Sequence, residues 1–289
     1  MLYTIIIYHF FILSIISTLF YIKKENNING GEKMKNYFLK VIVVCLTVIM
    51  LFPATSVSAK ECYWYCKRNS EHKQPLCDSN LSFIENFGGI YLDKRYGDNS
   101  SEKVIYLTFD VGYENGNVEK VLNAMAEEGV KGSFFILGNV IDRAPDLVKR
   151  IAAEGHSVCN HTVNHKNLTD ASIDTFNSEL TELEKKYREL TGREMSKFFR
   201  PPEGTFNEEM LKRAQALGYR TVFWSFAYAD WDNKIQMNEK AALDKIFTNL
   251  HNGEIMLLHP TGETNAKIMK RLITELKAQG YRFATLDEL

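Results

Sequence analysis

The fold of this chain is decided by the stretch VIYLTFD at residues 104–110, which the loop VGYENG follows at residues 111–116. Residues 104–109 are apolar and rich in β-branched and aromatic side chains, a composition typical of a buried strand. The strand ends on Asp110, and glycines in the loop separate it from a helix predicted from about residue 117. Because α/β proteins place their chemistry at the carboxyl ends of strands, Asp110 is a candidate site residue. The alternative is that it only caps the helix.

The composition and the N-terminal region indicate an exported globular protein. The chain has 289 residues, a net charge of -1 and 45% hydrophobic residues, so no basic excess indicates nucleic acid binding. Residues 34–59 combine a basic start, an apolar run and a small-residue cleavage site after Ala59, which predicts a secretory signal peptide. We therefore expect export across the cytoplasmic membrane. The protein is then secreted or bound to the cell wall, or anchored in the membrane if the segment is not cleaved.

A second apolar run, residues 2–22, precedes the signal peptide and is long enough to span a bilayer. The segment GGEKM at residues 30–34, however, can be encoded by a bacterial ribosome-binding site followed by a start codon. We therefore expect translation to begin at Met34. Residues 1–33 are then either a wrongly assigned upstream stretch or an extra hydrophobic segment. After cleavage the chain remains long enough for one sizeable domain.

Residues 60–102 form an extension that contains a cluster of cysteines and no clear hydrophobic period. Export permits disulfides, so two of the residues Cys62, Cys66 and Cys77 can pair and leave one free thiol. The same three cysteines with His72 can also form a Cys3His zinc site, although the spacing is not a standard one. The sequence leaves both interpretations open.

From residue 103 to the end of the chain, predicted strands alternate with predicted helices. The strands are expected at residues 104–110, 132–137, 156–160, 198–200, 221–225, 254–259 and 282–285. The helices are expected at residues 118–128, 145–154, 172–190, 207–217, 239–250 and 265–279. Such alternation is typical of a parallel sheet. Seven strands in one domain favour an incomplete (β/α) barrel over an open sheet.

Polar residues recur where the predicted strands end. In chain order they are Asp110, the pair His161 and His165, Arg200, Asp230 and His259. The carboxyl ends of parallel barrel strands meet on one face, so these residues predict a catalytic site. The two histidines are four residues apart, and one helical turn would bring both rings to the same side, a spacing suited to one metal ion. The alternative is that either ring only packs or caps.

Five motifs occur in order along the chain. They are TFDVG at residues 108–112, HTVNH at 161–165, RPPEG at 200–204, DW at 230–231 and LLH at 257–259. This set resembles the polysaccharide deacetylase family, the NodB-homology carbohydrate esterases of family 4, over residues 103–289. The resemblance implies a distorted (β/α)7 barrel of the NodB type, in one domain after the N-terminal segments. It also implies metal-assisted removal of acetyl groups from N-acetylated sugars.

Further residues resemble one branch of that family, the sporulation deacetylases that lead to muramic δ-lactam in spore-cortex peptidoglycan. They are YENG at residues 113–116, FWSFA at 223–227 and, upstream, Trp64, His72 and Pro75. The resemblance implies hydrolytic N-deacetylation of N-acetylmuramic acid in peptidoglycan. The implied partner is the peptidoglycan glycan strand, with no nucleic acid and no stable protein partner, and the implied location includes the spore cortex.

The resemblance also implies a role for each strand-end residue. Asp110 is the general base, His259 the general acid, Arg200 the partner that orients Asp110, Asp230 the group that keeps His259 protonated, and His161 and His165 the ligands of a divalent metal, expected to be Zn²⁺. One position departs from the family pattern, because Val111 stands where a second aspartate usually binds the metal. We therefore expect the metal to be weakly held.

Two other functions compete with this interpretation. One is deacetylation of another amino sugar, such as a chitin oligosaccharide or the glucosamine of peptidoglycan. The other is a glycan-binding pseudoenzyme whose metal site has lapsed at Val111. The presence of both an acid and a base with their partners argues against the pseudoenzyme, since a binding protein needs no acid–base pair.

Overall fold

The structure is a computed structural model that describes residues 60–289. The predicted signal peptide at residues 34–59 and the segment at residues 1–33 lie outside the described residues. Within residues 60–289, no helix is long and apolar enough to cross a membrane.

A seven-stranded parallel sheet forms the centre of the fold, as predicted. Its strands are β4 (Lys103–Val111), β5 (Ser133–Ile136), β6 (Ser157–Asn160), β7 (Phe198–Phe199), β9 (Arg220–Thr221), β10 (Glu254–Leu258) and β11 (Tyr281–Ala284). The strand order is β10-β4-β5-β6-β7-β9, and β11 pairs with the first half of β4. From Val104 onward every residue of β4 is buried, which explains why this strand reads as a continuous apolar run.

The sheet curls into a distorted (β/α)7 barrel, which confirms the predicted fold class. Closure is completed after β9, where Phe226 forms a parallel bridge with Met256 of β10. The strand predicted at residues 221–225 is therefore shorter than expected. The observed strand β9 is Arg220–Thr221, so only Thr221 of the predicted range lies in a ladder, because the chain then leaves β7 and reaches β10 through single bridges.

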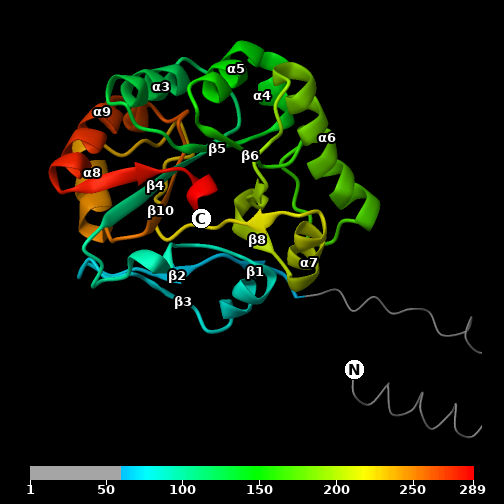
Figure 1. The fold of residues 1–289 in the computed structure, drawn as a ribbon, viewed down its shortest axis with the longest axis horizontal. Coiled ribbons are helices and arrows are strands. Elements are labelled where there is room, and N and C mark those ends of the chain that lie inside the picture. The colour runs from blue at the N-terminus through cyan, green and yellow to red at the C-terminus, as the bar shows by residue number, and fades with distance from the viewer. Residues whose placement is uncertain (1–59) are drawn as a thin grey trace, which may run out of the picture. The chain divides into compact units, whose positions relative to one another are not determined.

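Seven α-helices connect the strands of the described chain and surround the barrel (Figure 1). They are α3 (Asn117–Glu127), α4 (Gly138–Arg143), α5 (Pro145–Ala153), α6 (Ile173–Thr191), α7 (Glu208–Ala216), α8 (Glu239–Asn249) and α9 (Glu263–Ala278). Six match predicted helices within a few residues, and several begin at side chains that cap them, such as Ser172 before α6 and Asn207 before α7. The short α4 was not predicted, since its six residues are too few for a helical period to show.

The N-terminal extension is more ordered than its sequence indicated. It contains β1 (Cys62–Tyr63), β2 (Cys66–Lys67), β3 (Leu76–Cys77) and the 3-10 turns η1 (Ser82–Phe87) and η2 (Lys94–Tyr96). In Figure 1 this cyan segment runs below the barrel, and β1 pairs antiparallel with β8 (Thr205–Phe206). The ring of Trp64 stacks on Phe223 with centroids 4.5 Å apart. These long-range contacts join the extension to the barrel.

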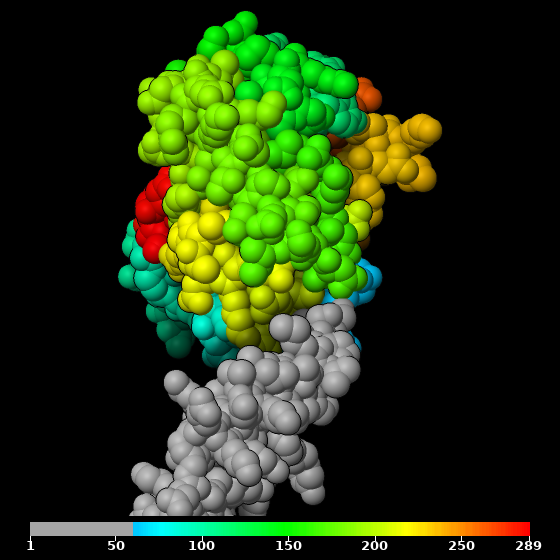
Figure 2. Space-filling model, turned by 90° about the vertical axis from the view of Figure 1, so that its right-hand side faces the viewer, coloured from blue at the N-terminus to red at the C-terminus, as the bar shows by residue number. Residues whose placement is uncertain are grey.

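The two ends of the barrel face opposite sides of the molecule. In Figure 2 the red C-terminal segment lies at the left edge, and the golden atoms of the residues near 230 protrude at the right. The protruding loop follows Asp230 and exposes Trp231 and Ile235, whose exposed fractions are 63% and 75%. The remaining turns are η3 (Pro202–Gly204), beside β8, and η4 (Leu286–Glu288), at the C-terminal end.

Candidate active site

A cavity of about 750 Å³ opens at the carboxyl ends of the strands and is lined by four of the predicted site residues. Asp110 lies in β4, His161 and His165 follow β6, and His259 follows β10. The other two predicted site residues do not line the cavity. Each lies behind a lining residue and forms a hydrogen bond with it. The structure therefore brings together all six residues that the sequence singled out.

Asp110 is held by the fully buried guanidinium of Arg200. Arg200 Nη1 donates to Asp110 Oδ1 at 2.7 Å, and Nη2 donates to Thr108 Oγ1 at 2.9 Å. Burial by itself raises the pKa of the Asp110 carboxyl. The nearby positive charge, chiefly that of Arg200, outweighs burial and holds that pKa below its ordinary value. Asp110 is therefore ionised at neutral pH, and its Oδ2 atom is left free of the arginine.

His161 is oriented as metal-binding histidines usually are. Its Nδ1 atom lies 2.8 Å from the carbonyl oxygen of Arg200, so Nδ1 carries the proton and donates it. Nε2 keeps its lone pair and lies 3.5 Å from Asp110 Oδ2. Burial is the main cause that lowers the pKa of His161 to about 4, so the ring is neutral at physiological pH. The ring centroids of His161 and His165 are 4.9 Å apart.

The two histidines come together through a loop, and the prediction of a helical turn was wrong. Residues 161–165 contain no helix, and Thr162 and His165 have positive φ angles of 75° and 55°. The His165 backbone N–H donates to Thr162 Oγ1 at 2.9 Å, which stabilises this turn. Left-handed residues reverse the chain direction within a few positions, so a loop can bring residues four apart together as a helix does.

The donor set for a metal is incomplete in the part of the chain that the structure describes. Val111 is fully buried in the apolar core and offers no donor atom. Asn160 bonds within the core, Asn164 bonds to Glu179, and Glu114 accepts from a backbone N–H of its own loop. No group of three or more His, Cys, Asp or Glu side chains among residues 60–289 could hold a metal ion. The imidazoles of His161 and His165 fit two ligand positions of a divalent cation and leave the others to water or substrate.

His259 is paired with Asp230 in the same way that Asp110 is paired with Arg200. His259 Nδ1 lies 2.7 Å from Asp230 Oδ1, and the His259 backbone N–H donates to Oδ2 at 2.8 Å. Burial by itself lowers the pKa of His259. The hydrogen bond and charge of Asp230, with a smaller effect of Asp110, outweigh burial and raise that pKa above its ordinary value. The ring is therefore biased toward its protonated form, with Nε2 as its remaining N–H.

Two residues that support the site were not singled out from the sequence. The amide of Asn265 donates to Asp230 Oδ2 at 2.6 Å and to the His259 carbonyl at 3.0 Å, and it accepts from the Tyr228 hydroxyl at 2.5 Å. Thr108 accepts from Arg200, as described above. Asn265 lies in helix α9, far along the chain from Asp230, so no local pattern could have indicated it. Thr108 lies in β4, two residues before Asp110. Side chains two residues apart in a strand point to the same face, so the sequence could have indicated Thr108 as a neighbour of Asp110.

The walls of the cavity carry aromatic rings suited to a sugar. Trp224, Trp231 and Tyr113 line it, and the ring of Trp231 meets that of His259 edge-on with centroids 6.2 Å apart. Pyranose rings have apolar faces that pack on aromatic side chains, while polar groups at the rim set orientation. This lining indicates a carbohydrate substrate.

A buried arrangement of Ser225, His251 and Glu254 has triad-like geometry but cannot act as a nucleophilic site. His251 Nε2 lies 2.8 Å from Ser225 Oγ, and Nδ1 lies 3.2 Å from Glu254 Oε2. All three residues are at most 1% exposed, so no substrate reaches the hydroxyl. Burial lowers the pKa of His251 to about 4 and raises that of Glu254, so the group serves as a neutral core network.

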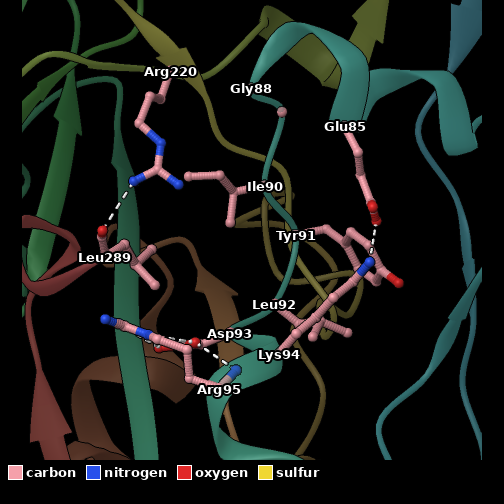
Figure 3. Close-up of a pocket in the computed structure, with 11 residues that line it drawn as sticks. Glu85, Gly88, Ile90, Tyr91, Leu92, Asp93, Lys94, Arg95, Arg220 and Leu289 are labelled. Carbon is pink, nitrogen blue, oxygen red and sulfur yellow. Dashed lines mark hydrogen bonds and ion pairs between the residues drawn. The ribbon is translucent and has the colours of Figure 1, made fainter.

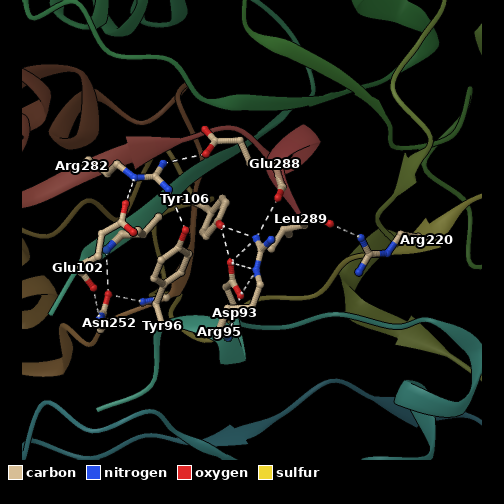
Figure 4. A network of polar contacts seen from close by, with 12 residues as sticks. Asp93, Arg95, Tyr96, Glu102, Tyr106, Arg220, Asn252, Arg282, Glu288 and Leu289 are labelled. Carbon is tan, nitrogen blue, oxygen red and sulfur yellow. Dashed lines mark hydrogen bonds and ion pairs between the residues drawn. The ribbon is translucent and has the colours of Figure 1, made fainter. Parts of the chain in front are cut away.

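A second cavity, of about 360 Å³, lies near the C-terminal residues and is shown in Figure 3. Its charged side chains are already paired. Lys94 pairs with Glu85, and Arg220 donates to the Leu289 carbonyl at 3.0 Å. Figure 4 shows the adjoining network, in which Asp93 accepts from Arg95 at 2.7 Å and from the Tyr106 hydroxyl at 2.6 Å. This network joins the extension to the barrel, and its paired charges leave none free for catalysis.

The cysteine cluster of the extension does not form the Cys3His arrangement. The His72 ring bonds to the Leu250 carbonyl at 2.8 Å, on the barrel. Cys66 and Cys77 face each other across the β2–β3 pair, and both are thiols in this structure, as is Cys62. Burial raises the pKa of Cys66 to about 12, which disfavours the thiolate that zinc requires. Among residues 60–289, neither the zinc arrangement nor a disulfide is formed.

Residues 97–222 match the family model described as polysaccharide deacetylase. The chain is 38% identical over 251 residues to the peptidoglycan-N-acetylmuramic acid deacetylase PdaA of Bacillus subtilis, covering 85% of this chain and 94% of that protein. This chain belongs to the polysaccharide deacetylase family. Its homologues are hydrolases that cleave amide bonds, and so is this protein.

Solved structures agree with this assignment. The structure of Bacillus subtilis PdaA, a family 4 carbohydrate esterase, superposes with a TM-score of 0.75 at 39% identity, covering 80% of this chain and 97% of that one. The structure of a family 4 carbohydrate esterase from Bacillus anthracis superposes with a TM-score of 0.65 at 32% identity, covering 80% and 96%. Both similarities extend over most of the described barrel.

Proposed function

We propose that this protein hydrolyses the N-acetyl group of N-acetylmuramic acid residues in peptidoglycan. The observation that carries the proposal is that one cavity contains both an acid and a base, each held by a charged partner. An ionised carboxylate backed by an arginine and an imidazole backed by a carboxylate line the same space. This is the acid and base that amide hydrolysis requires. The choice of muramic acid rests on the similarity to PdaA over 85% of the chain.

The chain's own residues divide the proton transfers of the reaction. Asp110 accepts a proton from the attacking water at Oδ2, the oxygen that Arg200 leaves free. The water oxygen bonds to the acetyl carbon, the C–N bond breaks, and acetate leaves. His259 donates its Nε2 proton to the departing nitrogen, so the sugar is left with a free amine. Asp230 is a positioning residue, which acts by holding His259 oriented and protonated.

We further propose that His161 and His165 hold a divalent cation, expected to be Zn²⁺, and hold it weakly. The donated Nδ1 proton of His161 and the free lone pair on Nε2 support this role, and the apolar Val111 supports weak binding. A divalent cation lowers the pKa of bound water and polarises the acetyl carbonyl. That chemistry complements Asp110, whose low pKa makes it a weak base.

The cellular role that fits this chemistry is the formation of muramic δ-lactam in the spore cortex, outside the cytoplasmic membrane. A free amine on muramic acid can condense with the lactyl carboxyl of the same sugar and release water, which closes the lactam ring. The predicted signal peptide at residues 34–59 and the resemblance to the sporulation branch support this role.

The test is mass spectrometry of muropeptides and of peptide-free glycan after incubation with the mature protein. We expect loss of acetyl from muramic acid, and a loss at least about 100-fold slower with Asp110→Asn. Loss from glucosamine alone would show a deacetylase of another amino sugar. Glycan binding without any loss of acetyl would show a pseudoenzyme. In cells, cortex that keeps its δ-lactam when the gene is deleted would contradict the proposed role.

A further inference from the structure

One rim of the active-site cavity carries a carboxylate that is not needed for the proton transfers. Glu203 lines the cavity and is exposed, and its side chain forms no hydrogen bond or ion pair with any residue among 60–289. Its backbone is left-handed, with φ 59° and ψ 7°. Non-glycine residues adopt this conformation when the surroundings impose it, and such positions cluster at ligand sites.

The surroundings that impose it come from the barrel and from the extension. The Trp64 backbone N–H donates to the Gly204 carbonyl at 2.9 Å, directly after Glu203. A Cβ atom on Gly204 would lie 2.7 Å from the ring of Trp224, so the turn is pressed against that ring. The backbone of the turn is therefore fixed by packing on both sides, which sets the point from which the Glu203 side chain extends.

The extension also places an exposed aromatic ring close to the turn that carries Glu203. Tyr63 pairs with Thr205, two residues from Glu203, in the β1–β8 ladder. The ring is 66% exposed. Its hydroxyl donates to Glu61 Oε1 at 2.6 Å. The hydrogen bond to Glu61 is the main cause that raises the pKa of the Tyr63 phenol, and the charge of Glu203 contributes, as expected for neighbouring groups.

Glu61 connects this ring to the loop of the two histidines. Its Oε2 atom accepts from Asn167 Nδ2 and from Thr169 Oγ1, each at 2.7 Å, and these residues follow His165 closely. An exposed tyrosine is thus held at a defined orientation by a network that joins the extension to the catalytic face.

We propose that Tyr63 and Glu203 form a subsite for the sugar next to the one that is deacetylated, and that this sugar is uncharged. The ring of Tyr63 packs on the apolar face of the pyranose, and the Glu203 carboxylate accepts hydrogen bonds from its hydroxyls. A carboxylate repels an anionic sugar at close range. This subsite rests on the proposed function, because a peptidoglycan strand alternates N-acetylmuramic acid with N-acetylglucosamine. A muramic acid in the catalytic position therefore has an uncharged neighbour.

The subsite lies partly outside the region that matches the family model. Tyr63 and Glu61 precede residues 97–222, whereas Glu203 lies within them. The inference therefore gives the extension a function in binding, in addition to its packing on the barrel.

The test compares a long and a short substrate on the mature protein. The probes are N-acetylmuramic acid, which fills only the catalytic position, and a tetrasaccharide of alternating N-acetylglucosamine and N-acetylmuramic acid. For Tyr63→Ala we expect KM for the tetrasaccharide to rise about tenfold with kcat unchanged, the effect of losing one stacked ring. KM for the monosaccharide should change less than about twofold. Glu203→Gln should raise KM for the tetrasaccharide in the same selective way.

Two further variants separate binding from folding. Tyr63→Phe keeps the ring and loses the hydroxyl, so it should retain most of the affinity for the tetrasaccharide. Tyr65→Ala removes a tyrosine of similar exposure, 60%, from the same extension and should have no effect. The subsite would be overturned if Tyr63→Ala raised KM equally for both probes or left KM for the tetrasaccharide unchanged. It would also be overturned if Tyr65→Ala raised KM for the tetrasaccharide as much as Tyr63→Ala does.

Calorimetric titration of both probes into Asp110→Asn, with and without Tyr63→Ala, distinguishes this inference from the proposed function. If no acetyl is released from any glycan, the function fails, and the selective loss of tetrasaccharide binding still supports the subsite. If acetyl is released and Tyr63→Ala binds the tetrasaccharide as well as its parent does, the subsite fails alone.

Discussion

Replacing Asp230 by asparagine removes the charge that supports the proposed acid and changes little else. The Asp230 carboxylate is 2% exposed and accepts from His259 at two atoms and from Asn265. A hydrogen bond to a charged group contributes about 1.5–3 kcal/mol. One pKa unit corresponds to about 1.4 kcal/mol. Asp230→Asn should therefore remove about 1.5–3 kcal/mol of stabilisation from the protonated His259 ring and lower the pKa of His259.

The sign of the effect on rate follows from the protonation that catalysis requires. His259 acts as an acid only when protonated, so kcat falls as pH rises through its pKa. Asp230 raises that pKa in the wild type. In Asp230→Asn the alkaline decline in kcat should therefore begin at a lower pH than in the wild type. The assay is acetate release from the muramic acid glycan at saturating concentration, measured from about pH 5 to pH 10.

The same shift predicts a change in stability. A histidine whose folded pKa is raised stabilises the fold fully below its unfolded pKa of about 6.5 and loses that contribution as pH rises through the folded value. The free energy of unfolding of the wild type should fall across that window, and that of Asp230→Asn should fall less. Asp232→Asn is the matched control, since it removes an exposed charge from the same loop and should shift neither curve. An unchanged alkaline limb in folded Asp230→Asn would refute the pairing as the source of His259 acidity.

Three further outcomes test the rest of the site. Asp110→Asn and His259→Ala should each lower kcat about 100-fold or more, and the double variant should lose far less than the product, because both act on one reaction coordinate. Near-normal turnover in either folded variant would show its role to be wrong. Calorimetry should find weak Zn²⁺ binding that His161→Ala abolishes and Cys66→Ser leaves unchanged. If only Cys66→Ser abolished Zn²⁺ binding, the metal would instead occupy a structural site in the extension. Val111→Asp should destabilise the metal-free protein by roughly 3 kcal/mol, because it buries a carboxylate, and Zn²⁺ should recover part of that loss as it gains a ligand. Equal Zn²⁺ affinities of the two proteins would contradict this reasoning.

Much of the barrel could be predicted from local patterns in the sequence. The apolar run that ends at Asp110 is buried on both faces of a parallel sheet, and such a strand must be apolar throughout. Helices with one apolar face, such as α3 with Val118, Val121 and Leu122, follow a period that can be read directly. Since strand ends meet on one face of a barrel, the positions of Asp110 and His259 in the chain already predicted that they share a site.

The contacts that tune the site depended on the tertiary structure. The sequence indicated a helical turn for His161 and His165, but left-handed residues at positions 162 and 165 bring the rings together instead. Local spacing cannot distinguish these two solutions, because both place side chains four residues apart on one side. Asn265, which bonds to Asp230, lies 35 positions further along the chain, in the helix that follows His259.

The N-terminal extension shows most clearly the difference between what the sequence predicts and what only the tertiary structure decides. Its sequence indicated only cysteines and scattered aromatic residues, without a period. Pairing of β1 with β8 connects residues more than a hundred positions apart and places Tyr63 opposite Thr205, two residues after Glu203. Local composition determines which segments bury themselves, because burial depends on the side chains present in each segment. Packing over the whole barrel decides which segments contact each other. Those contacts set the orientation and the charge state of the site residues.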